Sequence, residues 1–197
     1  MKKYFVVGLL LCTFLLGACQ AKRPDKSAKP KHSETVHLEK AKKLQIGVTY
    51  RKGKSKNPNA FYIKLIDDKH CVYMLDDSHY TEKDIKEISE DGYAFYPYIS
   101  LTEGEYYKDG DDYILKPTRT QKIEFKDANH VKDKIIATKK QKDRSDSEEG
   151  VRIVKKGAGY VQKTKQGDFL LYKTNKKLPN SIDDFLAQYD YQPEELD

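Results

Sequence analysis

Residues 104–115 read Gly-Glu-Tyr-Tyr-Lys-Asp-Gly-Asp-Asp-Tyr-Ile-Leu. The pair Asp109-Gly110 lies between two short runs rich in tyrosine and aliphatic residues, Gly104 to Tyr107 and Tyr113 to Leu115. Asp-Gly between two such runs is a strong signal for a tight hairpin turn, because Gly and Asp accept the positive φ that these turns require. The stretch therefore predicts an antiparallel β-hairpin.

Short strands of the same kind are predicted along the rest of the chain. In residues 44–50, Leu44, Ile46, Val48 and Tyr50 alternate with more polar residues, which is the pattern of a half-buried strand. The other predicted strands are 60–66, 70–75, 118–125, 134–138, 150–155, 159–163 and 168–173. Strands at intervals of roughly 8 to 12 residues are typical of all-β folds. We expect a mainly β (α+β) fold, an antiparallel meander or a small barrel of short strands.

Two helices and one charged loop complete the expected fold. Ile182, Phe185, Leu186 and Tyr189 recur at helical spacing after a candidate cap, Ser181, and predict one C-terminal helix. A short helix is expected near 80–89, with Ile85 and Ile88 facing inward. Residues 139–149 are almost all charged or polar and are expected to form an exposed loop.

The N-terminus has the three parts of a secretory signal. A basic start at Lys2 and Lys3 precedes an apolar core from Tyr4 to Leu16, and small residues follow. The core is shorter than the roughly 20 residues of a membrane-spanning helix. Leu16, Gly17, Ala18 and Cys19 resemble the lipobox of bacterial lipoproteins. The resemblance implies cleavage between Ala18 and Cys19 and a diacylglycerol on Cys19, which would hold the protein on the extracytoplasmic face of the cell membrane.

The charge distribution divides the chain into three parts. Residues 1–18 are the predicted signal peptide, 19–43 a flexible basic tether and 44–197 a β-rich globular domain, with a possible subdivision near residue 117. The tether carries a net charge of +5, whereas residues 44–197 carry −1 out of a total of +6. A nucleic-acid-binding domain would carry its basic residues on the fold. We therefore expect no nucleic-acid partner, and a tether attracted to anionic lipid headgroups.

Cysteine use agrees with this division. Cys12 would leave with the signal peptide and Cys19 would be lipidated, so Cys71 is the single thiol of the predicted mature chain. Cys71 lies in an apolar run, which indicates a buried structural thiol. Few cysteines and a strong excess of Lys over Arg are typical of a Gram-positive host. The twelve residues 104–115 are also similar to hairpins of lipocalin-like lipoproteins, a short resemblance that implies no function.

The best metal candidate is a repeated Asp-Asp-x-His, at Asp67 to His70 and at Asp76 to His79. The repeats are nine residues apart, with a predicted strand between them, and would lie nearly 30 Å apart at about 3.3 Å per residue. Asp at strand ends is ordinary turn chemistry. No motif of nucleophilic catalysis or phosphate binding occurs. We predict no catalytic residues, no metal site and no cofactor; the alternative is a small envelope hydrolase or metal-binding lipoprotein that uses His70, His79 and neighbouring Asp.

Tyrosine is unusually frequent, with 15 residues and no Trp. Tyr suits interfaces because its ring is apolar and its tip polar. A cluster of tyrosines is the predicted contact surface: Tyr93, Tyr96, Tyr98, Tyr106 and Tyr107. We expect a surface-tethered, non-catalytic, monomeric binding lipoprotein. Its partners would be the membrane, through Cys19, and an envelope protein, peptide or polymer.

Overall fold

The computed structural model describes residues 39–54, 59–90, 94–143 and 150–196. Predicted features at Cys19, Tyr93 and most of the loop 139–149 lie outside these ranges. The elements are β1 (Thr49–Lys52), β2 (Ala60–Leu65), β3 (His70–Asp77), α1 (Glu82–Ser89), β4 (Tyr98–Asp109), β5 (Asp112–Glu124), α2 (Ala128–Asp133), β6 (Ile135–Ile136), β7 (Thr138–Asp143), β8 (Val151–Lys156), β9 (Gly159–Thr164), β10 (Gly167–Thr174), α3 (Ile182–Leu186) and β11 (Asp190–Tyr191).

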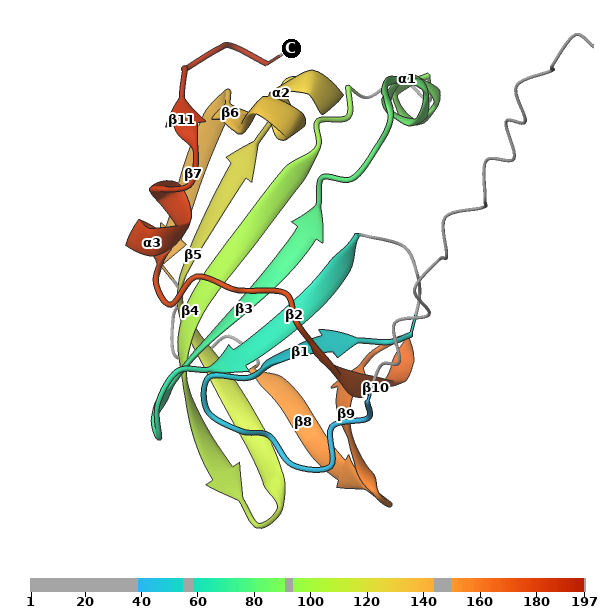
Figure 1. Ribbon diagram of the computed structural model, residues 1–197, viewed down its shortest axis with the longest axis vertical. Coiled ribbons are helices and arrows are strands. Elements are labelled where there is room, and N and C mark those ends of the chain that lie inside the picture. The colour runs from blue at the N-terminus through green and yellow to red at the C-terminus, as the bar shows by residue number, and fades with distance from the viewer. Residues whose placement is uncertain (1–38, 55–58, 91–93, 144–149, 197) are drawn as a thin grey trace, which may run out of the picture. The chain divides into compact units, whose positions relative to one another are not determined.

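Eight strands close into an antiparallel barrel (Figure 1). Each strand pairs with the next in the order β1, β2, β3, β4, β5, β8, β9 and β10, and β10 returns to β1 with Thr49 opposite Thr174. This architecture confirms the prediction of a mainly β fold with a small barrel and few helices. Because the barrel is closed, each of these eight strands pairs with a neighbouring strand on both sides.

The long hairpin of β4 and β5 organises the barrel. It turns at Gly110, where φ is +62°, as the Asp-Gly signal predicted. A bulge between Glu103 and Gly104 brings the two strands so close that a Cβ on Gly104 would lie 2.4 Å from the carbonyl oxygen of Lys116. Residues 113–115 of β5 pair with β8, and residues 119–124 pair with β7. The barrel is therefore closed at one end of β5, and a sheet continues beyond it at the other end.

The first of two cores fills the barrel. It contains at least one buried residue from each of the eight barrel strands, including a row of aromatic rings. The ring centroids of Tyr106 and Tyr113 lie 6.0 Å apart, and those of Tyr113 and Tyr160 lie 5.6 Å apart. Cys71 is buried here, and burial raises the pKa of its thiol to about 12. The predicted burial of this thiol is confirmed.

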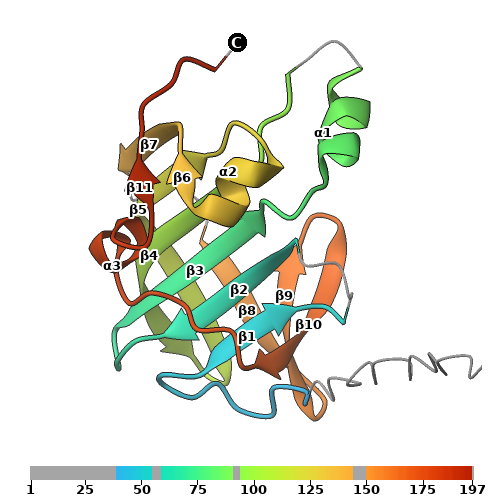
Figure 2. The same cartoon turned by 45° about the horizontal axis from the view of Figure 1, so that its top comes forward.

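The second core lies on the outer face of β2 to β5. Val72, Met74 and Leu101 point outward there and are covered by α2, α3 and the segment before α3. Figure 2 shows this segment, residues 175–180, running across β2 and β3 from β10 to α3. We call it the strap. The predicted C-terminal helix is present: Ser181 caps it by accepting a hydrogen bond from the Asp184 N–H, and Ile182 and Phe185 are buried.

Some predicted elements differ from the structure. The first strand begins only at Thr49, because Gly47 has φ +77° and turns the chain, and Ile46 is 55% exposed. The charged residues 138–143 form β7 rather than a loop, since backbone pairing with β5 needs no apolar side chains. The predicted helix is α1, capped by Thr81, but none of its residues is buried, so Ile85 and Ile88 do not face a core.

The fold also begins earlier than predicted. Residues 39–41 run along β10: the Lys173 N–H donates to the Glu39 carbonyl oxygen, and the Ala41 N–H donates to that of Leu171. On the other side, the Tyr160 N–H of β9 donates to the Ala41 carbonyl oxygen. Ala41 and Leu44 belong to the barrel core. The last residues of the predicted tether are thus part of the domain.

Because Ala41 is buried and Lys42 is exposed, introducing a negative charge at these two neighbouring positions should affect the stability of the fold very differently. Ala41→Asp puts a carboxylate where the side chain is 2% exposed and should destabilise the fold by about 3 kcal/mol or more. Lys42→Asp, at an exposed position, should change the free energy of unfolding by less than about 0.5 kcal/mol. Urea unfolding followed by circular dichroism measures both. Equal, small effects would show that this segment is tether after all.

Candidate functional site

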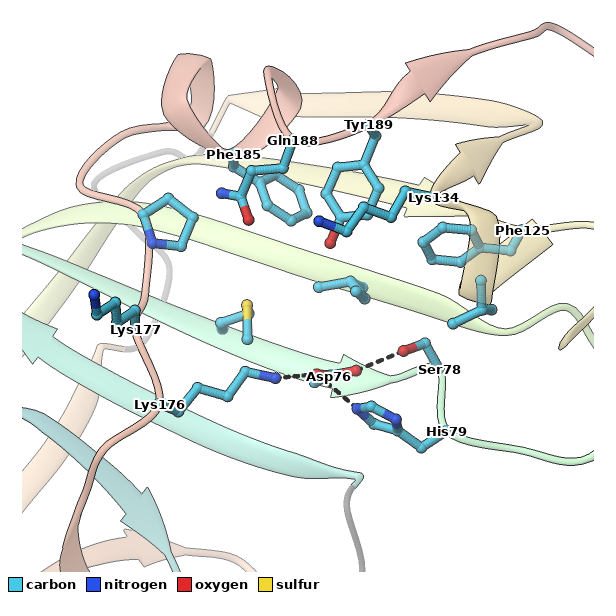
Figure 3. Close-up of a pocket in the computed structure, with 14 residues that line it drawn as sticks. Asp76, Ser78, His79, Phe125, Lys134, Lys176, Lys177, Phe185, Gln188 and Tyr189 are labelled. Carbon is cyan, nitrogen blue, oxygen red and sulfur yellow. Dashed lines mark hydrogen bonds and ion pairs between the residues drawn. The ribbon is translucent and has the colours of Figure 1, made fainter. Parts of the chain in front are cut away.

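A pocket of about 190 Å³ lies on the outer face of the sheet, between β3, β4, the strap, α2 and α3 (Figure 3). Its apolar lining comes from both the sheet and the covering helices: Met74, Ile99, Phe125, Val131, Pro179, Phe185 and Tyr189. A polar cluster occupies one side of it, around Asp76.

Asp76 is the centre of the polar cluster. It faces outward from β3, opposite Ile99 of β4, and is only 2% exposed. Its carboxylate accepts hydrogen bonds from the Lys176 Nζ at 2.6 Å and the Ser78 Oγ at 2.7 Å. The Nε2 of His79 lies 3.2 Å from the same carboxylate. The strap supplies Lys176, so this contact joins segments 100 residues apart in the sequence.

The cluster keeps Asp76 ionised. Burial alone would raise the pKa of the carboxyl group, but the hydrogen bonds from His79, Lys176 and Ser78 and the charge of Lys176 outweigh it and hold the pKa well below its usual range. Across the pocket, burial, and to a lesser degree the negative charge of Asp76, raises the pKa of Tyr189 to about 12. Asp76 is therefore an anion and Tyr189 a neutral phenol at neutral pH.

The arrangement suits binding better than nucleophilic catalysis. Ser78 and His79 both bond to Asp76 and not to each other, whereas an activated serine needs a direct bond to its base. The carboxylate is already occupied by three partners. On the rim, Lys134 and Lys177 form no ion pair with any residue that the structure describes. The pocket can hold an apolar group that carries hydrogen-bond acceptors.

The other predicted polar candidate, His70, is not part of this site. It begins β3, whereas Asp77 ends that strand, so the two Asp-Asp-x-His repeats lie at its opposite ends as the sequence predicted. The His70 Nδ1 lies 2.8 Å from Asp67, whose carboxylate also accepts the backbone N–H groups of Lys69 and His70. Among the described residues no group of three or more His, Cys, Asp or Glu could hold a metal ion.

The predicted tyrosine surface is not a single surface. Tyr106 faces the barrel interior, is 8% exposed and donates a hydrogen bond to the Asp67 carbonyl oxygen. Tyr107, its neighbour on β4, points outward and is half exposed. Tyr96 and Tyr98 are half-buried, and the Lys122 ammonium lies 4.3 Å from the ring centroid of Tyr98. Including Tyr106 in a contact surface was wrong, because successive residues of a strand point to opposite faces.

Sequence reasoning missed the burial of Asp76 and its ion pair with Lys176. The residue was interpreted as part of a turn, although it continues the outward-facing series Val72, Met74, Asp76 at a spacing of two. An acid on an apolar strand face needs a partner cation. That partner, Lys176, could not be identified from the sequence, since many lysines are available and only the strap's path selects one.

Comparison with protein-family models, with curated proteins and with solved structures gives no match to this chain. Within the described residues, no helix is long and apolar enough to cross a membrane.

The ion pair between Asp76 and Lys176 should contribute strongly to the free energy of unfolding. Lys176→Met leaves a buried carboxylate without its cation and should destabilise the protein by about 3 kcal/mol. Because the folded-state pKa of Asp76 is lowered, its stabilisation is present above the ordinary carboxyl pKa and disappears as the pH falls through the folded value. Urea unfolding at pH 7 and at lower pH measures both effects, and the loss caused by the variant should shrink in acid.

A matched control is Lys69→Met, which removes the exposed pair with Glu105. Exposed pairs typically contribute about 0.2–1 kcal/mol, so this variant should change little. Equal losses in the two variants would contradict a special role for the pair of Asp76 and Lys176.

Proposed function

We propose that this chain is a bacterial membrane lipoprotein whose folded domain binds a ligand at the cell envelope without catalysing a reaction. The observation that carries the proposal is the sequence Leu16-Gly17-Ala18-Cys19 directly after an apolar core and a basic start. Two acyl chains on Cys19 hold a protein stably, since each buried methylene contributes about 0.8 kcal/mol and one chain alone is marginal. The basic residues between Cys19 and the domain add attraction to anionic headgroups.

The domain supports a binding role. Its outer-face pocket combines a rigid apolar floor with cations on the rim, which are the features of a small, preformed ligand site. The ligand would be an apolar group with acceptor atoms, carried by an envelope protein, peptide or polymer. The alternative is a hydrolase or metal carrier that uses both histidines, but His70 and His79 lie at opposite ends of β3 and each contacts a different carboxylate, His70 that of Asp67 and His79 that of Asp76.

Thiol counting tests the anchor. If Cys12 is removed and Cys19 is lipidated, the mature protein should show no thiol reactive with Ellman's reagent when folded, because Cys71 is buried, and one when unfolded in urea. Cys19→Ser should release the protein from the membrane into the medium. Two thiols after unfolding, or membrane retention of the variant without lipid, would overturn the lipoprotein assignment.

Site-directed photocrosslinking on intact cells tests the pocket. A photoreactive amino acid at Gln188, on the pocket rim, should give a discrete light-dependent adduct. The same group at Lys163, an exposed position of β9 outside the pocket, is the matched control. We expect the adduct at Gln188 to weaken when Lys134→Glu reverses a rim charge. The same adducts at both positions would show that the pocket is not the contact site.

A further inference from the structure

A second pocket, of about 410 Å³, lies on the other side of the strap at the start of β1 and the end of β10. Lys176 and Lys177 of the strap line both this pocket and the one beside Asp76. Four lysines line it, Lys64, Lys173, Lys176 and Lys177, and no Asp or Glu does. The other polar lining groups are the side chains of Thr49, Thr174, Asn175 and Asn180. A hollow with several cations and no acid is an unusual lining on a domain with almost no net charge.

Lys64 is the most informative of these residues. It faces outward from β2, opposite Thr49 and Val72, and is 7% exposed. Its ammonium donates to two neutral oxygens of the strap, the Leu178 carbonyl and the Asn180 Oδ1, the latter at 2.7 Å. No carboxylate among the described residues lies within ion-pair distance. Burial lowers the pKa of Lys64, and the attraction of the more distant Asp184 only partly offsets this.

A buried ammonium without a counter-ion is costly, and proteins rarely retain one. Neutral acceptors occupy two of its three N–H groups and leave the third for another partner. Lys173 and Lys177 also lack an ion-pair partner in the described part of the chain, whereas Lys176 forms an ion pair with Asp76. Three positive charges thus converge on one hollow without an anion from the protein.

We propose that this pocket binds a phosphate group, with Lys64 as the buried cation that the phosphate neutralises and Lys173 and Lys177 as its outer contacts. Phosphate oxygens can accept hydrogen bonds from several lysines at once, and lysine is a common point-charge partner for phosphate. The threonine hydroxyls and asparagine amides supply further donors. The volume leaves room for an ester substituent of the size of glycerol. The site does not depend on the lipid anchor or on the ligand of the Asp76 pocket.

Calorimetry on the intact chain in non-ionic detergent at low ionic strength tests this site. We expect glycerol 1-phosphate and inorganic phosphate to bind more tightly than acetate, which offers fewer acceptors. The double variant Lys173→Gln with Lys177→Gln should weaken binding of glycerol 1-phosphate at least tenfold. Both residues are exposed, so the fold should tolerate the change.

The matched control is Lys132→Gln with Lys163→Gln, which removes the same charge from exposed positions that line neither pocket. It should leave the affinity within twofold of wild type. Lys64→Met should abolish binding, with near-ultraviolet circular dichroism to check that the strap remains packed. The proposal would be overturned if both double variants weakened the binding of glycerol 1-phosphate equally, or if the wild-type protein bound glycerol 1-phosphate no more tightly than acetate.

Monomeric dihexanoyl phosphatidylglycerol, compared with glycerol 1-phosphate, distinguishes the sources of the phosphate. Tighter binding of the lipid, sensitive to Lys173→Gln with Lys177→Gln, identifies a membrane headgroup as the ligand. Equal or tighter binding of glycerol 1-phosphate identifies a soluble or polymeric phosphoester.

Discussion

The structure depends on which strands pair with the two edges of β5. One edge pairs with β4 along nearly its whole length, while the other is shared between β8 and β7. Pairing with β8 closes the barrel, and pairing with β7 extends β5 and its neighbours beyond it. Because a closed barrel has an inside and an outside, strands β2 to β5 must bury both faces wherever helices cover them. That requirement determines where the covering segments, and hence the pockets, can lie.

The double burial is visible in the composition of β2 and β3. Residues 61–65 and 71–74 are apolar at nearly every position, without the alternation of a strand that has one solvated face. Ile63 and Cys71 fill the barrel, whereas Tyr62 and Val72 pack beneath the C-terminal elements. Such runs predict strands but not what lies on each side, so the two-layer arrangement could not be derived from them.

Local signals in the sequence were the most dependable. The Asp-Gly hairpin, the Ser181 cap with its apolar stripe and the strand 159–163 depend on neighbouring residues and are present in the structure. Predictions failed where tertiary pairing decided. Residues 138–143 are polar, yet the edge of β5 that continues beyond its pairing with β8 makes them a strand. Ala41 was assigned to the tether, yet it is part of the barrel core.

The candidate site was predictable only in part. An acid at position 76 within an apolar strand face indicates a buried ion pair, but the partner comes from a strap with no regular structure. The strap is held by two different lysine contacts, Lys176 to Asp76 from its own side and Lys64 to its backbone from the sheet. The first pair neutralises itself, and the second leaves a positive charge uncompensated. The same six-residue segment therefore lies between two pockets, one whose buried carboxylate has its cation and one whose buried ammonium has only neutral acceptors among the described residues.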